Sequence, residues 1–283
     1  MYDIVLVGHL AKDKIIFKGR KKEAPGGAPF YGAFPLLRMN KKVGIITKLR
    51  KEDFYITAPL VKELNLSIFV TFTQYTTGIE NIYPTDDVDY RICRPIKRAD
   101  KFMIEDFPQI NTKVYHIAPL IKGEVEKDVI EFLKKGAMIG LDVQGFVRVE
   151  ENGELIYKDW EEKVEILPLV DFLKADLKEA EILTGSSDPL KASEILNRWG
   201  AKEVLITRNE GVSVYTEGKY FEAPFTPSKI VGRTGRGDTC MASYIGARLE
   251  VSPYEALRFA AKLTSRKLEI EGPFNEEINL GGR

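Results

Sequence analysis

The residues from Gly232 to Asp238 read Gly-Arg-Thr-Gly-Arg-Gly-Asp and precede a run of small residues that predicts a packed helix. Gly235 and Gly237 lack the Cβ atoms that would keep a bulky anion away from the main chain. The N–H groups and the positive dipole end of the following helix would bind that anion. Because a carboxylate repels phosphate, Asp238 makes sense there as a base that removes a proton from an attacking hydroxyl. The stretch therefore indicates phosphoryl transfer to an alcohol.

An ordinary helix start is the alternative interpretation, since Asp and Thr favour cap and first-turn positions. It would account for Asp238 and Thr239, but not for two glycines on either side of Arg236. The loop also lacks the lysine of a P-loop, so that phosphate-binding motif is absent from it. We favour the catalytic interpretation over the helix cap alone.

Composition limits the classes of protein to consider. A chain of 283 residues can bury a large core, and its 42 basic and 42 acidic residues give a formal charge of zero. That balance gives no support for nucleic acid or membrane-surface partners. Two cysteines (Cys93, Cys240) and two histidines (His9, His116) provide neither a disulfide framework nor a His-rich metal site. With a strand pattern at residues 3–7 in place of a signal peptide, and no membrane-length apolar run, we expect a cytoplasmic protein.

Short apolar, β-branched runs alternate with longer amphipathic segments. The runs expected to be central strands are 4–7, 43–46, 114–117, 138–141, 172–173 and 204–206. The segments with a helical pattern are 29–38, 53–64, 124–134, 178–183, 190–199 and 254–268. This alternation predicts an α/β fold with a mostly parallel sheet covered on both faces, in which ligands bind beyond the carboxyl ends of the strands.

One region lacks intervening helices. Between residues 67 and 94 the runs 68–72, 78–82 and 89–93 are strand-like, and with 14–17 they would form a small antiparallel sheet. Such a sheet over an α/β core would act as a lid that excludes water, the competing phosphoryl acceptor. An edge extension of the main sheet is the alternative, which the length of the region disfavours. We therefore expect one domain over 1–283, with lid strands at about 12–20 and 67–95.

Four motifs in order along the chain resemble those of the ribokinase-like, PfkB-type family of carbohydrate kinases. They are the double glycine in Pro25-Gly26-Gly27-Ala28, the Asp176-Leu-Lys-Glu179 pattern, the stretch Thr207-Arg-Asn209-Glu-Gly211, and the loop Gly235-Arg236-Gly237-Asp238-Thr239. The resemblance covers nearly the whole chain. It implies a ribokinase-like three-layer α/β sandwich with a small antiparallel β lid, and a kinase that uses ATP and Mg²⁺.

The resemblance also implies roles on the donor side. Asp238 would be the general base, with the main chain of Gly235, Arg236 and Gly237 as the anion hole. Mg²⁺ would be organised by Glu179 and Asp176 through water molecules, which suits a hard, partly hydrated ion. The nucleotide would be bordered by Thr207, Asn209 and Gly211, with the adenine beside Ala260, Ala261 and Thr264. The alternatives are a helix N-terminus with favourable acids for the first pair and core packing for the last three residues.

On the acceptor side the family places an acid after the first strand, where this chain has Lys12 and Asp13. A carboxylate there can accept hydrogen bonds from two neighbouring hydroxyls, the usual contact with a sugar or polyol. Gly26 and Gly27 would let the substrate ring approach the main chain. The alternative for Lys12 and Asp13 is a solvated turn between the first strand and the lid.

Two departures from the family pattern are informative. The run Asp142-Val-Gln144-Gly-Phe-Val-Arg148 stands where an Asp-x-Asn-x-Arg pattern is common, and Gly232 stands where an aspartate commonly opens the signature loop. In these features the chain most resembles the myo-inositol kinase branch, archaeal and plant-like, which implies phosphorylation of the 3-hydroxyl of myo-inositol. The resemblance places Gln144 and Arg148 at the substrate, and an amide suits a ring that bears only hydroxyls. Arg236 could hold a phosphate oxygen, reach the acceptor or point to solvent.

Other interpretations stay open. The acceptor could be ribose, fructose, a 2-keto-sugar acid or a nucleoside, and a non-catalytic polyol-binding sensor would keep the same fold. Asp238 disfavours the sensor, because that acid has little value in merely holding phosphate. The phosphorylated hydroxyl, the choice of donor nucleotide, and a monomeric or homodimeric state are not decided by the sequence.

Overall fold

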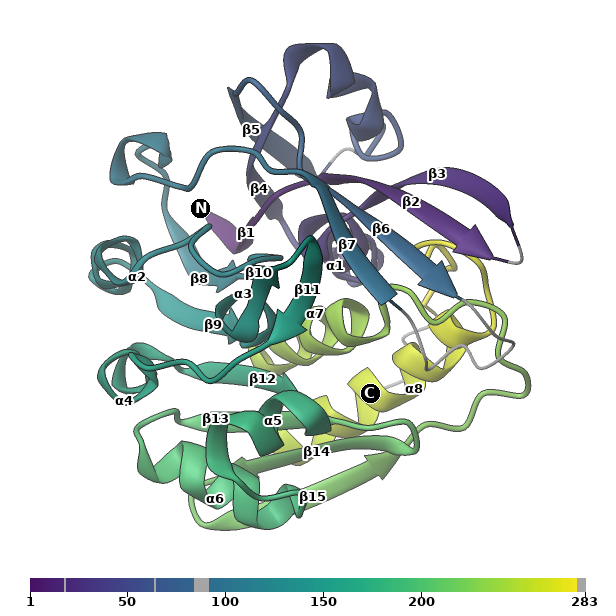
Figure 1. Cartoon of the computed structure of the whole chain (residues 1–283). Helices are drawn as coiled ribbons and strands as arrows, with labels where there is room; N and C mark the ends of the chain where they lie inside the picture. Colours follow the sequence, from purple (N-terminus) through teal and green to yellow (C-terminus); the bar gives the residue numbers. More distant parts are fainter. Residues whose placement is uncertain (18, 64, 84–91, 279–283) are drawn as a thin grey trace.

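A nine-stranded sheet runs through the middle of the molecule, in the strand order β15-β14-β13-β12-β9-β8-β1-β4-β5 (Figure 1). The structure is a computed structural model, which describes residues 1–17, 19–63, 65–83 and 92–278. The strands are β1 (Tyr2–Val7), β4 (Val43–Leu49), β5 (Leu66–Phe72), β8 (Thr112–Ile117), β9 (Met138–Asp142), β12 (Phe172–Asp176), β13 (Glu203–Thr207), β14 (Gly211–Thr216) and β15 (Lys219–Pro224).

The strands from β13 to β5 in this order pair in parallel, and they include all six runs expected to be central strands. Their side chains are mostly buried on both faces, which is why they read as continuous apolar runs. β14 and β15 were not expected. They extend one edge of the sheet in the antiparallel direction, through tight connections after β13.

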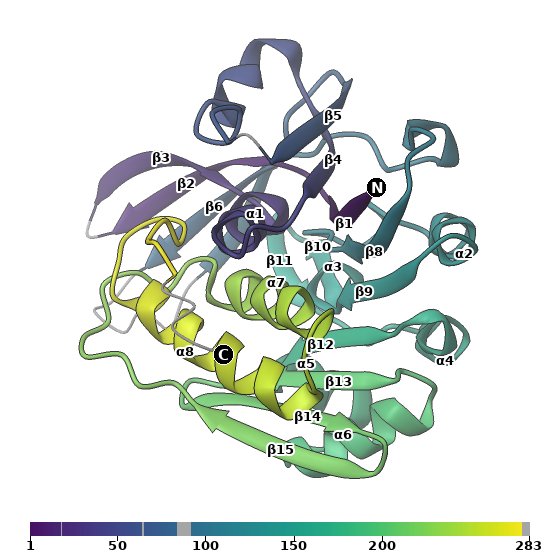
Figure 2. The same cartoon turned by 180° about the vertical axis from the view of Figure 1, so that it is seen from behind.

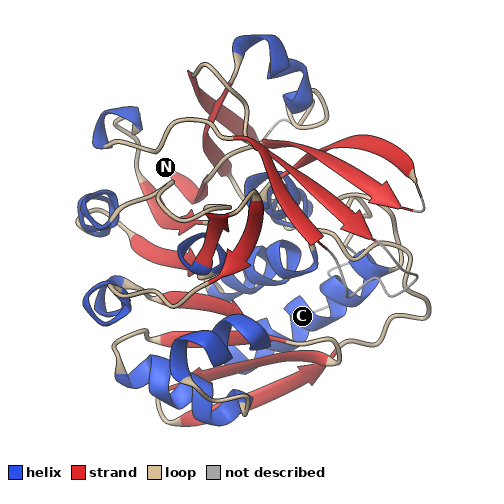
Figure 3. Ribbon diagram, in the orientation of Figure 1, coloured by secondary structure: helices blue, strands red, loops and turns tan. Residues whose placement is uncertain are grey.

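Helices cover both faces of this sheet (Figure 3). One layer holds α1 (Ala28–Arg38), α7 (Arg236–Arg248) and α8 (Pro253–Leu268), which lie in front of the sheet in Figure 2. The other holds α2 (Lys127–Lys134), α4 (Lys163–Ile166), the 3-10 helix η3 (Leu167–Leu169), α5 (Leu177–Thr184) and α6 (Pro189–Arg198). Each layer buries its own apolar cluster against the sheet, so the three-layer α/β sandwich is confirmed.

Local sequence signals set the starts of several helices. Ser252 and Glu255 form a reciprocal capping box at α8, followed by Pro253 at the first helical position. Asp176 and Glu179 form the same arrangement at α5. The expected helix at 53–64 is the one that differs most from the structure, which has the 3-10 helix η1 (Lys51–Thr57) there. Leu64 lies outside the described residues.

A second, four-stranded sheet projects over one side of the core (Figure 1). It contains β2 (Ala11–Phe17), β3 (Arg20–Gly26), β6 (Gly78–Tyr83) and β7 (Ile92–Lys97). Its outer pairs, β2–β3 and β6–β7, are antiparallel, whereas the central pair β2–β6 is parallel, so the sheet is mixed. This sheet has the position expected of the lid, and we call it the lid.

The expected bounds of the lid were partly wrong. Residues 68–72 belong to β5, the edge strand of the main sheet, because Ile68 and its neighbours pair in parallel with β4. The edge extension that was disfavoured thus accounts for this segment. Conversely, β3 belongs to the lid although it was not expected as a strand. Of the expected strand 89–93, residues 89–91 lie outside the described residues, as does the whole segment 84–91.

Three smaller elements complete the description. The helix α3 (Gln144–Val147) leads into the hairpin of β10 (Arg148–Glu151) and β11 (Glu154–Tyr157), which approaches the lid through an Arg94–Glu154 ion pair at 3.1 Å. The 3-10 helix η2 (Ile104–Asp106) follows the lid. Within the described ranges, none of the helices combines the length and apolar character needed to span a bilayer.

Candidate active site

A cleft with a volume of about 780 Å³ lies between the lid and the carboxyl ends of the main-sheet strands. The lid contributes side chains from β2, β6 and β7, the hairpin contributes β11, and the core contributes the ends of β12 and β13 and the start of α7. The predicted site residues that line it are Asp13, Gly27, Gln144, Arg148, Asp176, Thr207, Asn209, Gly235, Arg236, Gly237 and Asp238. The fold therefore brings most of the expected residues together.

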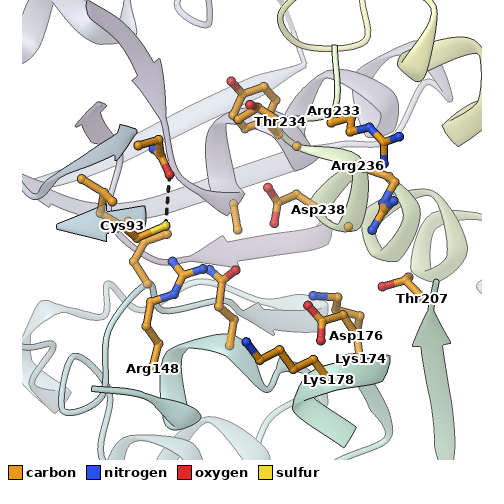
Figure 4. Close-up of a pocket in the computed structure, with 18 of the residues that line it drawn as sticks. Cys93, Arg148, Lys174, Asp176, Lys178, Thr207, Arg233, Thr234, Arg236 and Asp238 are labelled. Carbon is orange, nitrogen blue, oxygen red and sulfur yellow. Dashed lines mark hydrogen bonds between the residues drawn. The ribbon is translucent and has the colours of Figure 1, made fainter. Parts of the chain in front are cut away.

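The signature loop reaches the cleft as predicted, because Gly235 takes a left-handed conformation (φ +82°) and starts α7. A Cβ atom at Gly235 would lie 2.2 Å from Cδ1 of Tyr31, so both the conformation and the space require glycine. Asp238 is in the first turn of the helix, and Figure 4 shows its carboxylate pointing into the cleft between Arg148 and Arg236.

Arg236 lies on the same side of the cleft as Thr207 and donates a hydrogen bond from Nη1 to Oδ1 of Asn209 at 2.8 Å (Figure 4). This contact ties the start of α7 to the β13–β14 connection, where Thr207 also lines the cleft (Figure 4). The guanidinium therefore lies at the site, and the alternative that it only points to solvent is wrong. Two further arginines of the cleft lining come from the loops on this side: Arg208 and Arg233. We call this cation-rich part the donor end.

A buried lysine below the signature loop was missed. Nζ of Lys174 lies 3.1 Å from Oδ1 of Asp142 and 3.7 Å from Oε2 of Glu179, and it is close enough to Gly237 that a Cβ there would be 3.2 Å away. Burial acts to lower the pKa of Lys174, but the surrounding carboxylates, Asp142 first, raise it above its usual range. It is thus a permanent cation beneath the anion-binding loop. A lysine inside an otherwise apolar strand was the signal in the sequence.

Asp176 and Glu179 are held by the capping box at α5, with reciprocal main-chain hydrogen bonds of 2.7 and 2.8 Å. Burial raises the pKa of Glu179, an effect that the ammonium of Lys174 opposes. The second carboxylate oxygen, Oε1, is buried without a hydrogen-bond partner. Asp176 lines the cleft above it. This pair fits a hydrated Mg²⁺ held through water, although among the described residues no group of three or more His, Cys, Asp or Glu forms a direct metal cage.

At the opposite end of the cleft, which we call the acceptor end, Asp13 lies on lid strand β2. Its Oδ1 accepts a hydrogen bond from the N–H of Ile79 at 3.0 Å, which fixes the carboxylate between two lid strands. A Cβ at Gly26 would lie 2.2 Å from the other oxygen, Oδ2, so Gly26 leaves room for this side chain. Gly27 (φ +92°) turns the chain from the lid into α1, where a Cβ would clash with the carbonyl oxygen of His9 at 2.2 Å.

The hairpin and α3 supply the other predicted acceptor residues. Gln144 follows Asp142, whose Oδ1 accepts its main-chain N–H at 3.1 Å. Arg148 is buried and its Nη2 donates to the hydroxyl of Tyr157 at 3.4 Å. The lid adds two polar groups that sequence reasoning missed: Asn81 and Cys93, which face each other on β6 and β7, with Sγ donating to Oδ1 at 3.4 Å (Figure 4).

Four predicted site residues lie outside the cleft lining, each for a physical reason. Lys12 pairs instead with Asp53 at 3.4 Å and Glu23 at 3.8 Å. Gly26 packs against Asp13, and Glu179 is buried below Asp176. Gly211 begins β14, where a Cβ would meet the carbonyl oxygen of Ala223 at 2.4 Å. The three residues expected beside an adenine, Ala260, Ala261 and Thr264, are buried in the core between α8 and the sheet.

Comparisons with known proteins agree with this geometry. Residues 151–274 match the family model of the pfkB family carbohydrate kinases. The chain is 31% identical, over 269 residues, to a cytidine kinase of Thermococcus kodakarensis, which covers 90% of this chain and 91% of the relative.

Two solved structures extend the comparison. A pyrophosphate-dependent kinase of the ribokinase family, in complex with a pyrophosphate analog and myo-inositol, superposes with a TM-score of 0.90 at 36% identity, covering 96% of this chain and 97% of that one. A pyrophosphate-dependent myo-inositol-1 kinase, converted by two substitutions into a myo-inositol-3 kinase, superposes with a TM-score of 0.88 at 35% identity, covering 96% and 95%. The chain is thus a phosphotransferase that acts on an alcohol, and it belongs to the pfkB family of carbohydrate kinases.

Proposed function

We propose that this kinase phosphorylates a hydroxyl of myo-inositol, with Asp238 as the general base. The observation that carries the proposal is the position of Asp238, at the glycine-lined start of α7 and between a cation-rich donor end and an acceptor end with a lid carboxylate and amide groups. Neutral amides and a carboxylate suit a ring that carries only hydroxyls. Two similar structures, whose descriptions name myo-inositol or a myo-inositol kinase, support the same acceptor.

In the proposed reaction the acceptor hydroxyl donates a hydrogen bond to the carboxylate of Asp238. As the hydroxyl oxygen forms its bond to phosphorus, its proton passes to Asp238 and the bond from phosphorus to the leaving oxygen breaks. The main-chain N–H groups at the start of α7 stabilise the negative charge on the moving phosphoryl group. Asp13 and Gln144 orient the ring, and the lid limits access of water to the phosphoryl group.

For the donor we favour inorganic pyrophosphate over the ATP expected from the sequence. The cleft lining at the donor end includes Arg208, Arg233 and Arg236, which suits a compact polyanion, and Arg236 is already fixed by Asn209. The residues expected beside an adenine are buried in the core. Both similar structures are of pyrophosphate-dependent kinases. Mg²⁺, held through water by Asp176 and Glu179, would neutralise part of the donor's charge when bound.

A nucleoside is the second candidate acceptor. The relative with 31% identity is a cytidine kinase. In this chain the rings of Tyr31, Tyr83 and Tyr157 line the cleft, so an aromatic contact with a base is available. A nucleoside would have to place its 5′-hydroxyl at Asp238 with the base against these rings, whereas myo-inositol needs only the polar groups of the acceptor end.

The lid is the part of the site that we expect to choose which hydroxyl reacts. Asn81 and Cys93 form a polar pair on the lid surface of the cleft, next to the apolar side chain of Ile79. A ring that hydrogen-bonds to Asn81 is held in one rotation relative to Asp238. The related myo-inositol-1 kinase changes its reactive hydroxyl with only two substitutions, so small changes suffice in this family. The 3-hydroxyl expected from the sequence stays our prediction.

The test is a matrix of donors and acceptors followed by phosphorus NMR. Pyrophosphate and ATP, each with Mg²⁺, are combined with myo-inositol, ribose, fructose, 2-keto-3-deoxygluconate and cytidine. We expect turnover with pyrophosphate and myo-inositol, and turnover at least about 100-fold slower in the same mixture with Asp238→Asn. Phosphorylation of cytidine but not of myo-inositol would support the second candidate. Tight binding of myo-inositol by calorimetry without turnover from either donor would favour a non-catalytic sensor.

A further inference from the structure

A lysine outside the cleft lining is buried beneath the loop that leads to Asp238. Lys267 lies in the last turn of α8, and its side chain is among the largest fully buried ones in the described structure, with 0% exposure. Lysines are rarely buried completely, because the ammonium loses its hydration. The buried position of Lys267 therefore indicates that its ammonium makes interactions that compensate for the lost hydration.

The partners of this ammonium are main-chain carbonyls. Nζ of Lys267 donates to the carbonyl oxygen of Gly232 at 3.0 Å and to that of Ile270 at 3.5 Å. Gly232 opens the signature loop at the position where the family commonly has an aspartate. A Cβ at Gly232 would lie 2.5 Å from the Ile270 oxygen, so no larger residue fits there while the carbonyls stay in place.

Main-chain hydrogen bonds attach the same segment to the end of α8. The N–H groups of Val231 and Gly232 donate to the carbonyl oxygen of Leu268 at 2.8 and 3.2 Å. Gly232 is therefore held on both sides, by its N–H and by its carbonyl. Because the carbonyl and the next N–H of a trans peptide point in opposite directions, Lys267 also directs the N–H of Arg233 away from α8. The chain reaches Gly235, the start of α7, soon afterwards.

The ammonium and the catalytic carboxylate also interact electrostatically. Burial lowers the pKa of Lys267 to about 8, and the negative charge of Asp238 acts in the opposite direction. Lys267 therefore carries its charge at neutral pH, and its field reaches the start of α7. A hydrogen bond from a charged donor is roughly twice as strong as a neutral one, so the carbonyls are held firmly.

We propose that Lys267 is a positioning residue for phosphoryl transfer: by binding the carbonyls of Gly232 and Ile270, its buried ammonium fixes the loop that places Asp238 and the anion-binding N–H groups. This inference rests on the proposed function, since it assumes that Asp238 acts as the base. The opposing interpretation is that Lys267 serves the stability of the fold and has no effect on the reaction.

The first experiment compares Lys267→Met and Lys267→Gln with the wild type in kcat, in KM for both substrates and in melting temperature. We expect kcat to fall by about 10- to 100-fold, because small misplacements of reacting groups are costly, while each KM changes little. The melting temperature should be unchanged or higher, since a buried charge is removed. Lys48→Met is the matched control: Lys48 is also buried and also binds a carbonyl, that of Lys101 at 2.8 Å, but both this partner and Asp106, at 2.6 Å, lie outside the signature loop. It should lose stability and keep kcat.

The second experiment is chemical rescue of Lys267→Ala. n-Propylammonium, which can donate to the carbonyls, should restore part of kcat, whereas tetramethylammonium, which has no N–H group, should not. Folded variants with the wild-type kcat would overturn the proposal, as would a loss of kcat that follows the loss of stability and resists rescue. Absence of turnover in the wild type would instead refute the proposed function itself.

Discussion

The two ends of the cleft are built in different ways. The donor end is formed by the ends of main-sheet strands and the start of α7, and it is rich in cations such as Arg233 and Arg236. The acceptor end is formed by the lid and the β10–β11 hairpin, with Asp13, Asn81 and the hydroxyl of Tyr157. One end rests on the core of the molecule, and the other on a separate four-stranded sheet.

We therefore expect the donor end to determine the rate of phosphoryl transfer and the acceptor end to determine which molecule and which hydroxyl react. In the proposed function, a charged donor would be bound by groups that the core holds in place, with Lys174 and Lys267 buried beneath the signature loop. The proposed acceptor would be bound mainly by side chains on strands that have their own hydrogen-bond ladder. Changes at the donor end should therefore alter turnover or donor affinity, whereas changes at the acceptor end should alter which molecule or hydroxyl reacts.

The largest expected effect is at the point where both ends meet. Asp238→Asn keeps the size of the side chain and removes the base, so we expect kcat to fall by about 10²- to 10⁴-fold. Donor binding, measured by isothermal titration calorimetry, should stay equal to or tighter than that of the wild type because a negative charge is lost. A variant with wild-type kcat would remove Asp238 from the mechanism.

Gly235→Ala tests the rigidity of the donor end. The new Cβ would meet the ring of Tyr31 at 2.2 Å, so the loop or the ring must move, and we expect kcat to fall by about 10²-fold. Gly218→Ala is the matched control, because Gly218 also has a positive φ (+73°) but nothing within 4 Å of the new atom. Both variants should lose about 1 kcal/mol of stability through backbone strain. Equal kcat values for the two would show that the loop tolerates displacement.

The buried cation beneath the donor end predicts a pH effect on stability. The pKa of Lys267 is about 8 in the folded chain, below its usual 10.5, so between these values the unfolded chain binds a proton that the folded chain does not. The contribution of this group to the free energy of unfolding therefore rises with pH in that window, by about 2 kcal/mol from pH 7 to pH 9.5. This contribution is the difference in the free energy of unfolding between the wild type and Lys267→Met, measured by urea unfolding at both pH values. If the wild type and Lys267→Met differed in free energy of unfolding by the same amount at both pH values, the lowered pKa would be contradicted.

Arg236→Met should change only the KM of the phosphoryl donor. The guanidinium that Asn209 fixes would be lost, and we expect KM for pyrophosphate to rise by about 10-fold, in the range of one charge-assisted hydrogen bond. KM for myo-inositol should change by less than twofold. Arg258→Met, at an exposed arginine on α8, is the control for a general charge effect. A rise in the KM of the acceptor instead would place Arg236 at the wrong end of the cleft.

Asn81→Leu should change only the KM of the acceptor, and this is the smallest kinetic effect that we expect. Loss of one neutral hydrogen bond costs about 1 kcal/mol, so we expect KM for myo-inositol to rise about fivefold with an unchanged KM for the donor. The ratio of myo-inositol phosphate isomers, measured by chiral chromatography, should change. An unchanged product ratio would mean that the lid does not choose the hydroxyl.

Much of the fold followed from periodicity in the sequence. All six expected central strands are in the sheet, because strands buried on both faces read as apolar runs. The assignment of residues 68–72 to the lid was wrong, since β5 looks the same in sequence whether it pairs with β4 or with lid strands. Only tertiary pairing decides between the two. The expectations of a single domain over 1–283, a cytoplasmic location and a monomer or homodimer stay predictions.

The candidate site was predictable where a residue type is chemically unusual in its position. The glycines around Arg236 and the acid that follows them mark the start of α7 correctly. Lys174 and Lys267 were missed because their neighbours are distant in sequence: Nζ of Lys267 binds Gly232, 35 residues away. Gly211 was assigned to the nucleotide, but its lack of a side chain serves the close approach of β15.

Three chain segments at the base of the lid meet in a buried, hydrogen-bonded cluster. The hydroxyl of Thr77 lies 2.8 Å from Nδ1 of His9 and accepts the N–H of Ala99, so the chain segments that enter and leave the lid meet at one buried ring. Because the lid strands share this anchor, they could be exchanged as one unit. Grafted together with α3 and the β10–β11 hairpin from a relative with another acceptor, its strands should carry that relative's preference onto this chain, while the signature loop and the donor end stay intact.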